Sequence, residues 1–174
     1  MRIGLYVLNI FCFMLMSCGD DKSTTEVTES ENTNQKTTIT AKVIENFDYT
    51  DYALSTEGEA ALSSWEKYQE LAIQISYLKK SDLSFFNGDK DVLKKFIGEF
   101  RISTPKQFLT NPIISRTVIL ETTLLKLNEN LTLETIDGRV KLISVKEVLI
   151  AFSNLNYQIN KKLERDIYDK IEPE

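Results

Sequence analysis

The 174-residue chain contains no histidine and only two cysteines, Cys12 and Cys18. The absence of histidine excludes a Ser-His-Asp triad, a Cys-His pair and a histidine-bound zinc or copper ion. Its six glycines form no Gly-rich loop of the kind that cradles phosphates. The remaining enzyme options are carboxylates, Ser-Lys pairs or bound Mg²⁺ or Ca²⁺, and none forms a recognisable motif. We predict a protein without catalytic activity, metal or cofactor.

Basic residues are too few to balance the acidic ones, at 21 against 26, and the formal net charge is −5. An acidic balance disfavours binding to nucleic acid and to anionic lipid through a polybasic patch. We therefore expect no nucleic-acid partner.

The chain has a single long apolar run, from Ile3 to Met16, which follows Arg2 and precedes Ser17 and Cys18. A positive start, an apolar core and a small residue before the cut are typical of a secretory signal. The run is shorter than the ~20 residues of a transmembrane helix. We therefore predict a signal peptide over residues 1–17.

The end of this signal, Leu15-Met16-Ser17-Cys18, resembles the lipobox of bacterial lipoproteins, with Met16 where a small residue is common. The resemblance implies cleavage before Cys18, a diacylglyceryl group on its sulfur and an acyl chain, such as palmitate, on its new amine. Several acyl chains together anchor a protein firmly. The alternative is an ordinary secretory signal in which Cys18 occurs by chance.

Residues 18–46 are predicted to be the lipidated cysteine and a disordered tether. The stretch after Cys18 contains nine Ser or Thr residues, six acidic residues and no aromatic one. Such a composition buries too little apolar surface to offset the entropy lost on ordering. A flexible chain of this length reaches roughly 30 Å. Aromatic residues begin at Phe47, so the folded domain is predicted to span residues 47–174.

Apolar residues at spacings of three and four predict four helices in that domain, over residues 56–79, 89–100, 111–128 and from 144 towards the end. Thr56 with Glu59 and Ser144 with Glu147 have the spacing of capping boxes, which mark helix starts. We predict an all-α fold, an up-and-down helical bundle of three long helices and one short one.

Residues 131–143 allow two interpretations. Alternating apolar residues flank Asp137-Gly138, a dipeptide typical of a tight β-hairpin turn. A lone two-stranded hairpin is marginally stable, however. The rival interpretation is a loop that enters the last helix early.

Four residues are candidates for ligand or partner contacts. Asn156 lies within the apolar stripe predicted for the last helix, either as a buried amide that fixes helix register or as the polar lining of a pocket. The apolar members of this stripe are Val145, Leu149, Phe152, Ile159 and Leu163. Arg116 lies at the edge of a stripe, where it either pairs with Glu66 or Glu70 or binds a carboxylate ligand. Phe85 and Phe86 either plug one end of the bundle or form an exposed patch for a partner.

The acidic pair Asp20-Asp21 behind Cys18 resembles the export signal of surface lipoproteins in Bacteroidota-type bacteria. This resemblance implies the outer membrane or the cell surface as the location. The folded part is similar to small helical lipoproteins of unknown function from the same group, in segments that imply no activity. These segments are 65–68 (WEKY), 111–116 (NPIISR) and 155–160 (LNYQIN).

Together these features predict a membrane-anchored envelope lipoprotein that acts as a non-enzymatic protein-interaction module. The alternative is a sensor or carrier that binds a small molecule between helices near Asn156 and Arg116. An inhibitor or immunity protein is a third idea, suggested by small size and acidity. An enclosed cavity of several hundred Å³ that reaches the polar groups favours the carrier. A solid core with a contiguous exposed apolar patch favours the interaction module.

Overall fold

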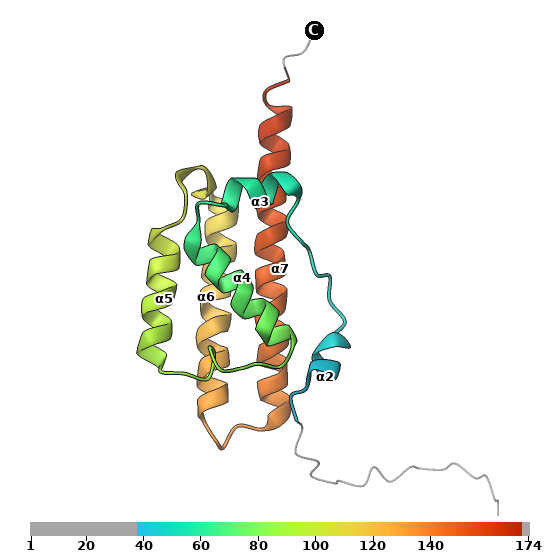
Figure 1. The fold of residues 1–174 in the computed structure, drawn as a ribbon, viewed down its shortest axis with the longest axis vertical. Helices are drawn as coiled ribbons and strands as arrows, with labels where there is room; N and C mark the ends of the chain where they lie inside the picture. Colours follow the sequence, from blue (N-terminus) through green and yellow to red (C-terminus); the bar gives the residue numbers. More distant parts are fainter. Residues whose placement is uncertain (1–37, 172–174) are drawn as a thin grey trace, which may run out of the picture. The chain divides into compact units, whose positions relative to one another are not determined.

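The computed structural model describes residues 38–171, so the predicted signal peptide, Cys18 and most of the tether lie outside the described residues. This part of the chain forms six α-helices and one 3₁₀ helix, and contains no strand. The elements, shown in Figure 1, are α2 (Ala41–Glu45), α3 (Thr56–Leu62), α4 (Glu66–Lys79), α5 (Lys90–Ile102), η1 (Lys106–Phe108), α6 (Asn111–Thr132) and α7 (Gly138–Tyr168).

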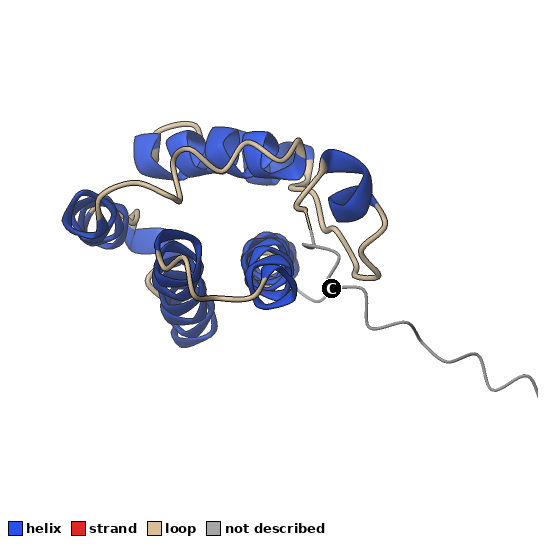
Figure 2. Cartoon of the chain, turned by 90° about the horizontal axis from the view of Figure 1, so that it is seen from below, coloured by secondary structure: helices blue, strands red, loops and turns tan. Residues whose placement is uncertain are grey.

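The helices form a bundle around the antiparallel pair α6 and α7. In Figure 1 the chain runs down α4, up α5, down α6 and up α7. Figure 2 shows α6 and α7 nearly end-on, with α4 lying across them in a second layer. The all-α class and the helical bundle are thus confirmed. The expected set of three long helices and one short one is not seen, because α6 and α7 have 22 and 31 residues, whereas α4 and α5 have 14 and 13.

The predicted helix over residues 56–79 is divided into α3 and α4 by a turn at residues 63–65. The Ser63 hydroxyl donates to the Ala60 carbonyl at 2.8 Å, the kind of local bond that competes with helix continuation. The turn also directs Trp65 into the core, where its indole N–H donates to the Phe100 carbonyl and to Ser103 Oγ. Helical periodicity alone does not reveal such a break.

The possible β-hairpin over residues 131–143 is wrong, and the interpretation of a loop that enters helix early is correct. Asp137 is the N-cap of α7, and its carboxylate accepts a hydrogen bond from the Arg139 N–H at 2.8 Å. Gly138 is the first residue of the helix and has no positive φ. A side-chain cap and 31 residues of packed helix stabilise this segment more than an isolated two-stranded hairpin can.

The core stripe predicted for the last helix is confirmed. Its apolar members from Val145 to Ile159 are buried, and Leu163 is partly buried against the core. Ile167 and Ile171, which continue the same spacing, are exposed. The fully buried side chains elsewhere include Trp65, Phe86, Phe108, Leu71 and Leu127.

The folded part begins earlier than residue 47. Helix α2 lies within the segment assigned to the tether, and Ile44 in it is 3% exposed. Thr40 caps α2 by accepting a hydrogen bond from the Val43 N–H. Two isoleucines, Ile39 and Ile44, provide the apolar contacts with the core that the tether composition as a whole conceals.

Candidate functional site

Three polar side chains on α7 bind a non-helical segment, residues 50–55, which we call the strap. The Ser153 hydroxyl accepts a hydrogen bond from the Tyr52 N–H and donates one to the Thr50 carbonyl, both at 2.7 Å. Asn156 Nδ2 donates to the Tyr52 carbonyl at 3.0 Å. Because Ser153 and Asn156 are three residues apart, their side chains lie on the same side of the helix. They provide hydrogen-bond partners for backbone N–H and C=O groups of the strap, which lies outside the helices.

Asn160, one turn further along α7, completes this set, which we call the polar ladder (Ser153, Asn156 and Asn160). Its Nδ2 donates to the Ala53 carbonyl at 2.9 Å, and its Oδ1 accepts from the Ser55 N–H at 3.0 Å. Gly58 approaches so closely that a Cβ atom there would lie 2.9 Å from Asn160 Oδ1. The strap is therefore fixed to α7 by five hydrogen bonds with three side chains.

Asn156 is 6% exposed, and both ends of its amide are bound within the chain. Its Oδ1 accepts a hydrogen bond from the Tyr68 hydroxyl at 2.6 Å. Burial, and secondarily the charge of Glu59, raises the pKa of Tyr68 well above its usual value, so this hydroxyl remains a donor. The geometry is that of a buried amide that links α4, α7 and the strap.

An open cleft of about 530 Å³ lies beside this amide. Its lining includes Leu54, Glu59, Tyr68, Gln69, Phe152 and Asn156. Asn156 therefore borders a space large enough for a small ligand, while its hydrogen-bonding groups face the strap and Tyr68. The cleft is open to solvent and does not form an enclosed cavity.

The structure separates Arg116 from the other candidates. Arg116 is exposed on α6, and no ion pair involves it among residues 38–171. Glu70, one of its two expected partners, pairs instead with Lys67 at 2.9 Å. Arg116 is also absent from the lining of the cleft beside Asn156.

Phe85 and Phe86 lie in the link between α4 and α5. Phe86 is fully buried, and Phe85 is half-buried with its ring in an edge contact with Phe96, at 5.2 Å between centroids. This is the plug arrangement. Asn128 secures it by donating to the Phe86 and Gly88 carbonyls, both at 2.9 Å. Asn128 is not among the residues predicted from the sequence, although an amide at the end of an apolar stripe is a usable signal.

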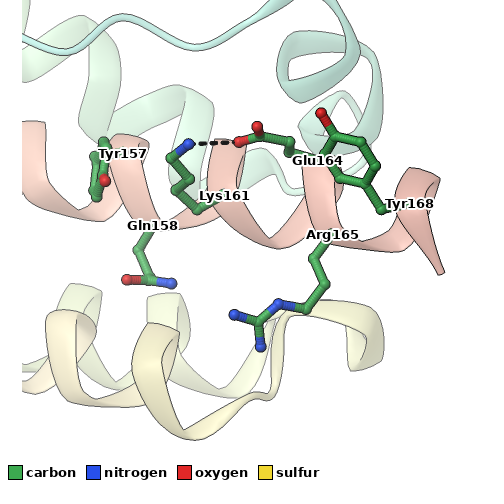
Figure 3. Close-up of a pocket in the computed structure, with 6 residues that line it drawn as sticks. All are labelled: Tyr157, Gln158, Lys161, Glu164, Arg165 and Tyr168. Carbon is green, nitrogen blue, oxygen red and sulfur yellow. Dashed lines mark hydrogen bonds and ion pairs between the residues drawn. The ribbon is translucent and has the colours of Figure 1, made fainter.

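The last turns of α7 differ from the rest of the helix. Residues 164, 165, 167 and 168 are exposed, with Ile167 and Tyr168 at 52% and 65%. Residues 169–171, which follow the helix, are exposed too, with Ile171 at 64%. In Figure 1 this end of α7 extends past α3. Figure 3 shows Tyr157, Lys161, Glu164 and Tyr168 in a row along one side of this stretch, while Gln158 and Arg165 point to another side.

Across residues 38–171, no group of three or more acidic or cysteine side chains is arranged to hold a metal ion. Within the same residues, no helix has both the length and the apolar character needed to cross a membrane.

Comparisons of the chain with family models, with curated proteins and with solved structures found no match.

Proposed function

We propose that the protein is a lipid-anchored, non-enzymatic interaction module of a bacterial envelope, held by Cys18 at the outer membrane or the cell surface. The exposed apolar end of α7 is the observation that carries the interaction. The folded part, from about residue 39 onwards, presents this end to a protein partner at the distance that the tether allows.

Burial against a partner would stabilise the end of α7. A helix end without packing contacts is marginally stable in water, because its backbone order is not offset by burial. Ile167 and Tyr168 at the end of α7, and Ile171 just after it, are nevertheless each more than half exposed. Apolar side chains gathered on a protruding element are typical of protein contact sites, where burial stabilises both the contact and the helix.

The alternative function is a small-molecule carrier, favoured by the open cleft of about 530 Å³ beside Tyr68 and Asn156. It has less support because the polar atoms of both side chains already bond within the chain. A thermal-shift screen with metabolites tests it. Stabilisation of the wild type by about 2.7 kcal/mol at a hundredfold excess over Kd would favour the carrier, provided that Asn156→Leu loses the gain and keeps its fold.

The anchor is tested with Cys18→Ala. Without the sulfur no diacylglyceryl group attaches, so acyl labelling should disappear and the protein should leave the membrane fraction. Cys12→Ala is the matched control, because Cys12 lies within the predicted signal, and it should retain the label. Continued membrane partition of Cys18→Ala after a mild salt wash would contradict the lipoprotein proposal.

The interaction surface is tested by placing a photo-crosslinking tyrosine analogue at position 168 or at position 77, in separate cultures. Tyr77 is a matched control because it is 45% exposed on α4, away from the end of α7. Irradiation of intact cells should give a protein adduct from position 168 and none from position 77. Equal adducts from both positions, or none from 168, would contradict the proposal.

A further inference from the structure

The row of side chains on the end of α7 has spacings and terminal tyrosines that read alike in both directions, whereas its two charges change places. Tyr157, Lys161, Glu164 and Tyr168 are separated by four, three and four residues, so that they line one side of the helix. A tyrosine lies at each end, and one cation and one anion lie between them. With Gln158 and Arg165 these four side chains line a shallow hollow of about 430 Å³.

A two-fold axis between Lys161 and Glu164 makes this row complementary to itself. When two copies of the helix lie antiparallel about that axis, Lys161 faces the partner's Glu164 and Tyr157 faces the partner's Tyr168. Each contact then occurs twice, as in isologous dimers. A parallel arrangement would place Lys161 against the partner's Lys161, so the charges select the antiparallel one.

We propose that the end of α7 binds a second copy of this chain in an antiparallel, two-fold pair of helices. This proposal rests on the proposed function and names the partner for its interaction surface.

The exposure of the four residues suits such a contact. Lys161 and Glu164 pair within the chain at 2.6 Å, yet their side chains remain 48% and 47% exposed, which leaves donors and acceptors for the partner's charges. Tyr157 and Tyr168 are 39% and 65% exposed. The ring of Tyr52 lies 4.7 Å from that of Tyr157, so the strap widens the aromatic surface that meets the partner's Tyr168.

The position of the row on α7 leaves room for the second copy. The core-facing stripe, which includes Leu155 and Ile159, lies on the opposite side of the helix from Lys161 and Glu164. Two bundles joined through the row therefore lie on opposite sides of the helix pair. The contact is small, so its affinity in solution is expected to be weak. Anchoring both copies in one membrane raises their effective concentration.

The test uses two full-length, lipidated copies with different affinity tags, co-expressed and captured from detergent-solubilised membranes through one tag. Wild-type copies should co-purify. Lys161→Glu in both copies places four acidic groups together, and recovery of the second tag should fall about tenfold. Glu164→Lys in both copies should have the same effect with four basic groups.

The decisive arm combines Lys161→Glu in one copy with Glu164→Lys in the other. Opposite charges then meet across the axis, so recovery should return to the wild-type amount. The ion pair within each chain remains broken in both copies, so a merely intramolecular role cannot explain the rescue. Lys94→Glu is the matched control, because it breaks an i,i+3 pair with Asp91 on another helix and should leave recovery unchanged.

Wild-type copies that do not co-purify, or a mixed pair recovered no better than the single variants, would overturn the second copy as partner. An adduct to a different protein from position 168 in the crosslinking experiment would then leave the proposed interaction module standing with another partner. Failure of both experiments would overturn both proposals.

Discussion

Residues 138–163 of α7 and residues 164–168 at its end are covered very differently. Along the first stretch, the core-facing apolar side chains, such as Val145, Leu149 and Ile159, are buried, and three polar side chains hold the strap. At the end, Ile167 and Tyr168 are exposed. One continuous helix therefore contains a part whose apolar stripe is buried by its own chain and a part whose apolar side chains remain in contact with solvent.

The largest expected effect comes from breaking the hydrogen bonds of the covered part. Asn156→Leu removes the acceptor of the Tyr68 hydroxyl and the donor to the Tyr52 carbonyl, both in a buried setting. The free energy of unfolding should fall by about 2–3 kcal/mol, and the melting temperature by roughly 10 °C. Thermal unfolding followed by circular dichroism measures this change.

The matched control for this variant is Asn154→Leu. Asn154 lies two residues away on α7 and is half-buried, and its side chain makes no hydrogen bond within residues 38–171. Its substitution should change the free energy of unfolding by less than about 0.5 kcal/mol. Equal effects of the two variants would mean that the amide of Asn156 contributes nothing specific.

The next largest effect on the free energy of unfolding is expected at the N-terminal end of α7. Asp137→Ala removes the carboxylate that caps the helix and should lower the free energy of unfolding by about 1 kcal/mol. Gly138→Ala should be neutral or slightly stabilising, because Gly138 is helical with no positive φ. Urea unfolding of both variants distinguishes the helix start from a hairpin turn. Clear destabilisation by Gly138→Ala would indicate a turn that needs glycine.

Much of the fold follows from local sequence, and α7 shows why. The spacing from Val145 to Leu163 specified the buried face, because a helix core repeats at a fixed period. The place of Asn156 within that stripe also identified it as a buried amide or a pocket residue. Its partners were not predictable, because Tyr68 and Tyr52 lie 88 and 104 residues away in the chain.

The errors have a common physical origin in contacts distant in sequence. The turn at residues 63–65 is stabilised by the Trp65 indole, whose acceptors are 35 and 38 residues further along. The tether composition concealed α2, because Ile44 finds its contacts in a core built from later helices. Local patterns therefore predicted elements and faces, but not helix breaks or polar partners.

A smaller effect is expected from Glu121 in α6, the helix that pairs with α7. Glu121 on α6 has one carboxylate oxygen, Oε1, that is buried and makes no hydrogen bond, and burial raises the pKa of this side chain despite the nearby Arg101. A raised pKa in the folded state means that stability is complete below the ordinary pKa of about 4.5 and is lost as the pH rises through the folded value.

Glu121→Gln should therefore stabilise the protein at pH 7, by less than about 1 kcal/mol because Arg101 partly offsets the burial. The gain should disappear near pH 3.5, where the glutamate is protonated. Urea unfolding at the two pH values measures it. Glu134→Gln, in the exposed turn after α6, is the control. An equal gain at both pH values would contradict the explanation from ionisation.

The smallest effect on the free energy of unfolding is expected at the exposed end of α7. A variant there can therefore separate partner binding from folding. Tyr168 is 65% exposed, and no ring contact within residues 38–171 involves it. Tyr168→Ser should therefore change the free energy of unfolding of the isolated monomer by less than about 0.5 kcal/mol, as measured by dilute thermal unfolding. In membranes the same change removes the ring that faces the partner's Tyr157, so recovery of a second tagged copy should fall severalfold.

The control is Tyr77→Ser, the same substitution on α4, which should change neither the free energy of unfolding nor the recovery of the second copy. If Tyr168→Ser destabilises the monomer as much as Asn156→Leu does, Tyr168 contributes to folding. Only a side chain that packs against its own chain can contribute that much to the free energy of unfolding.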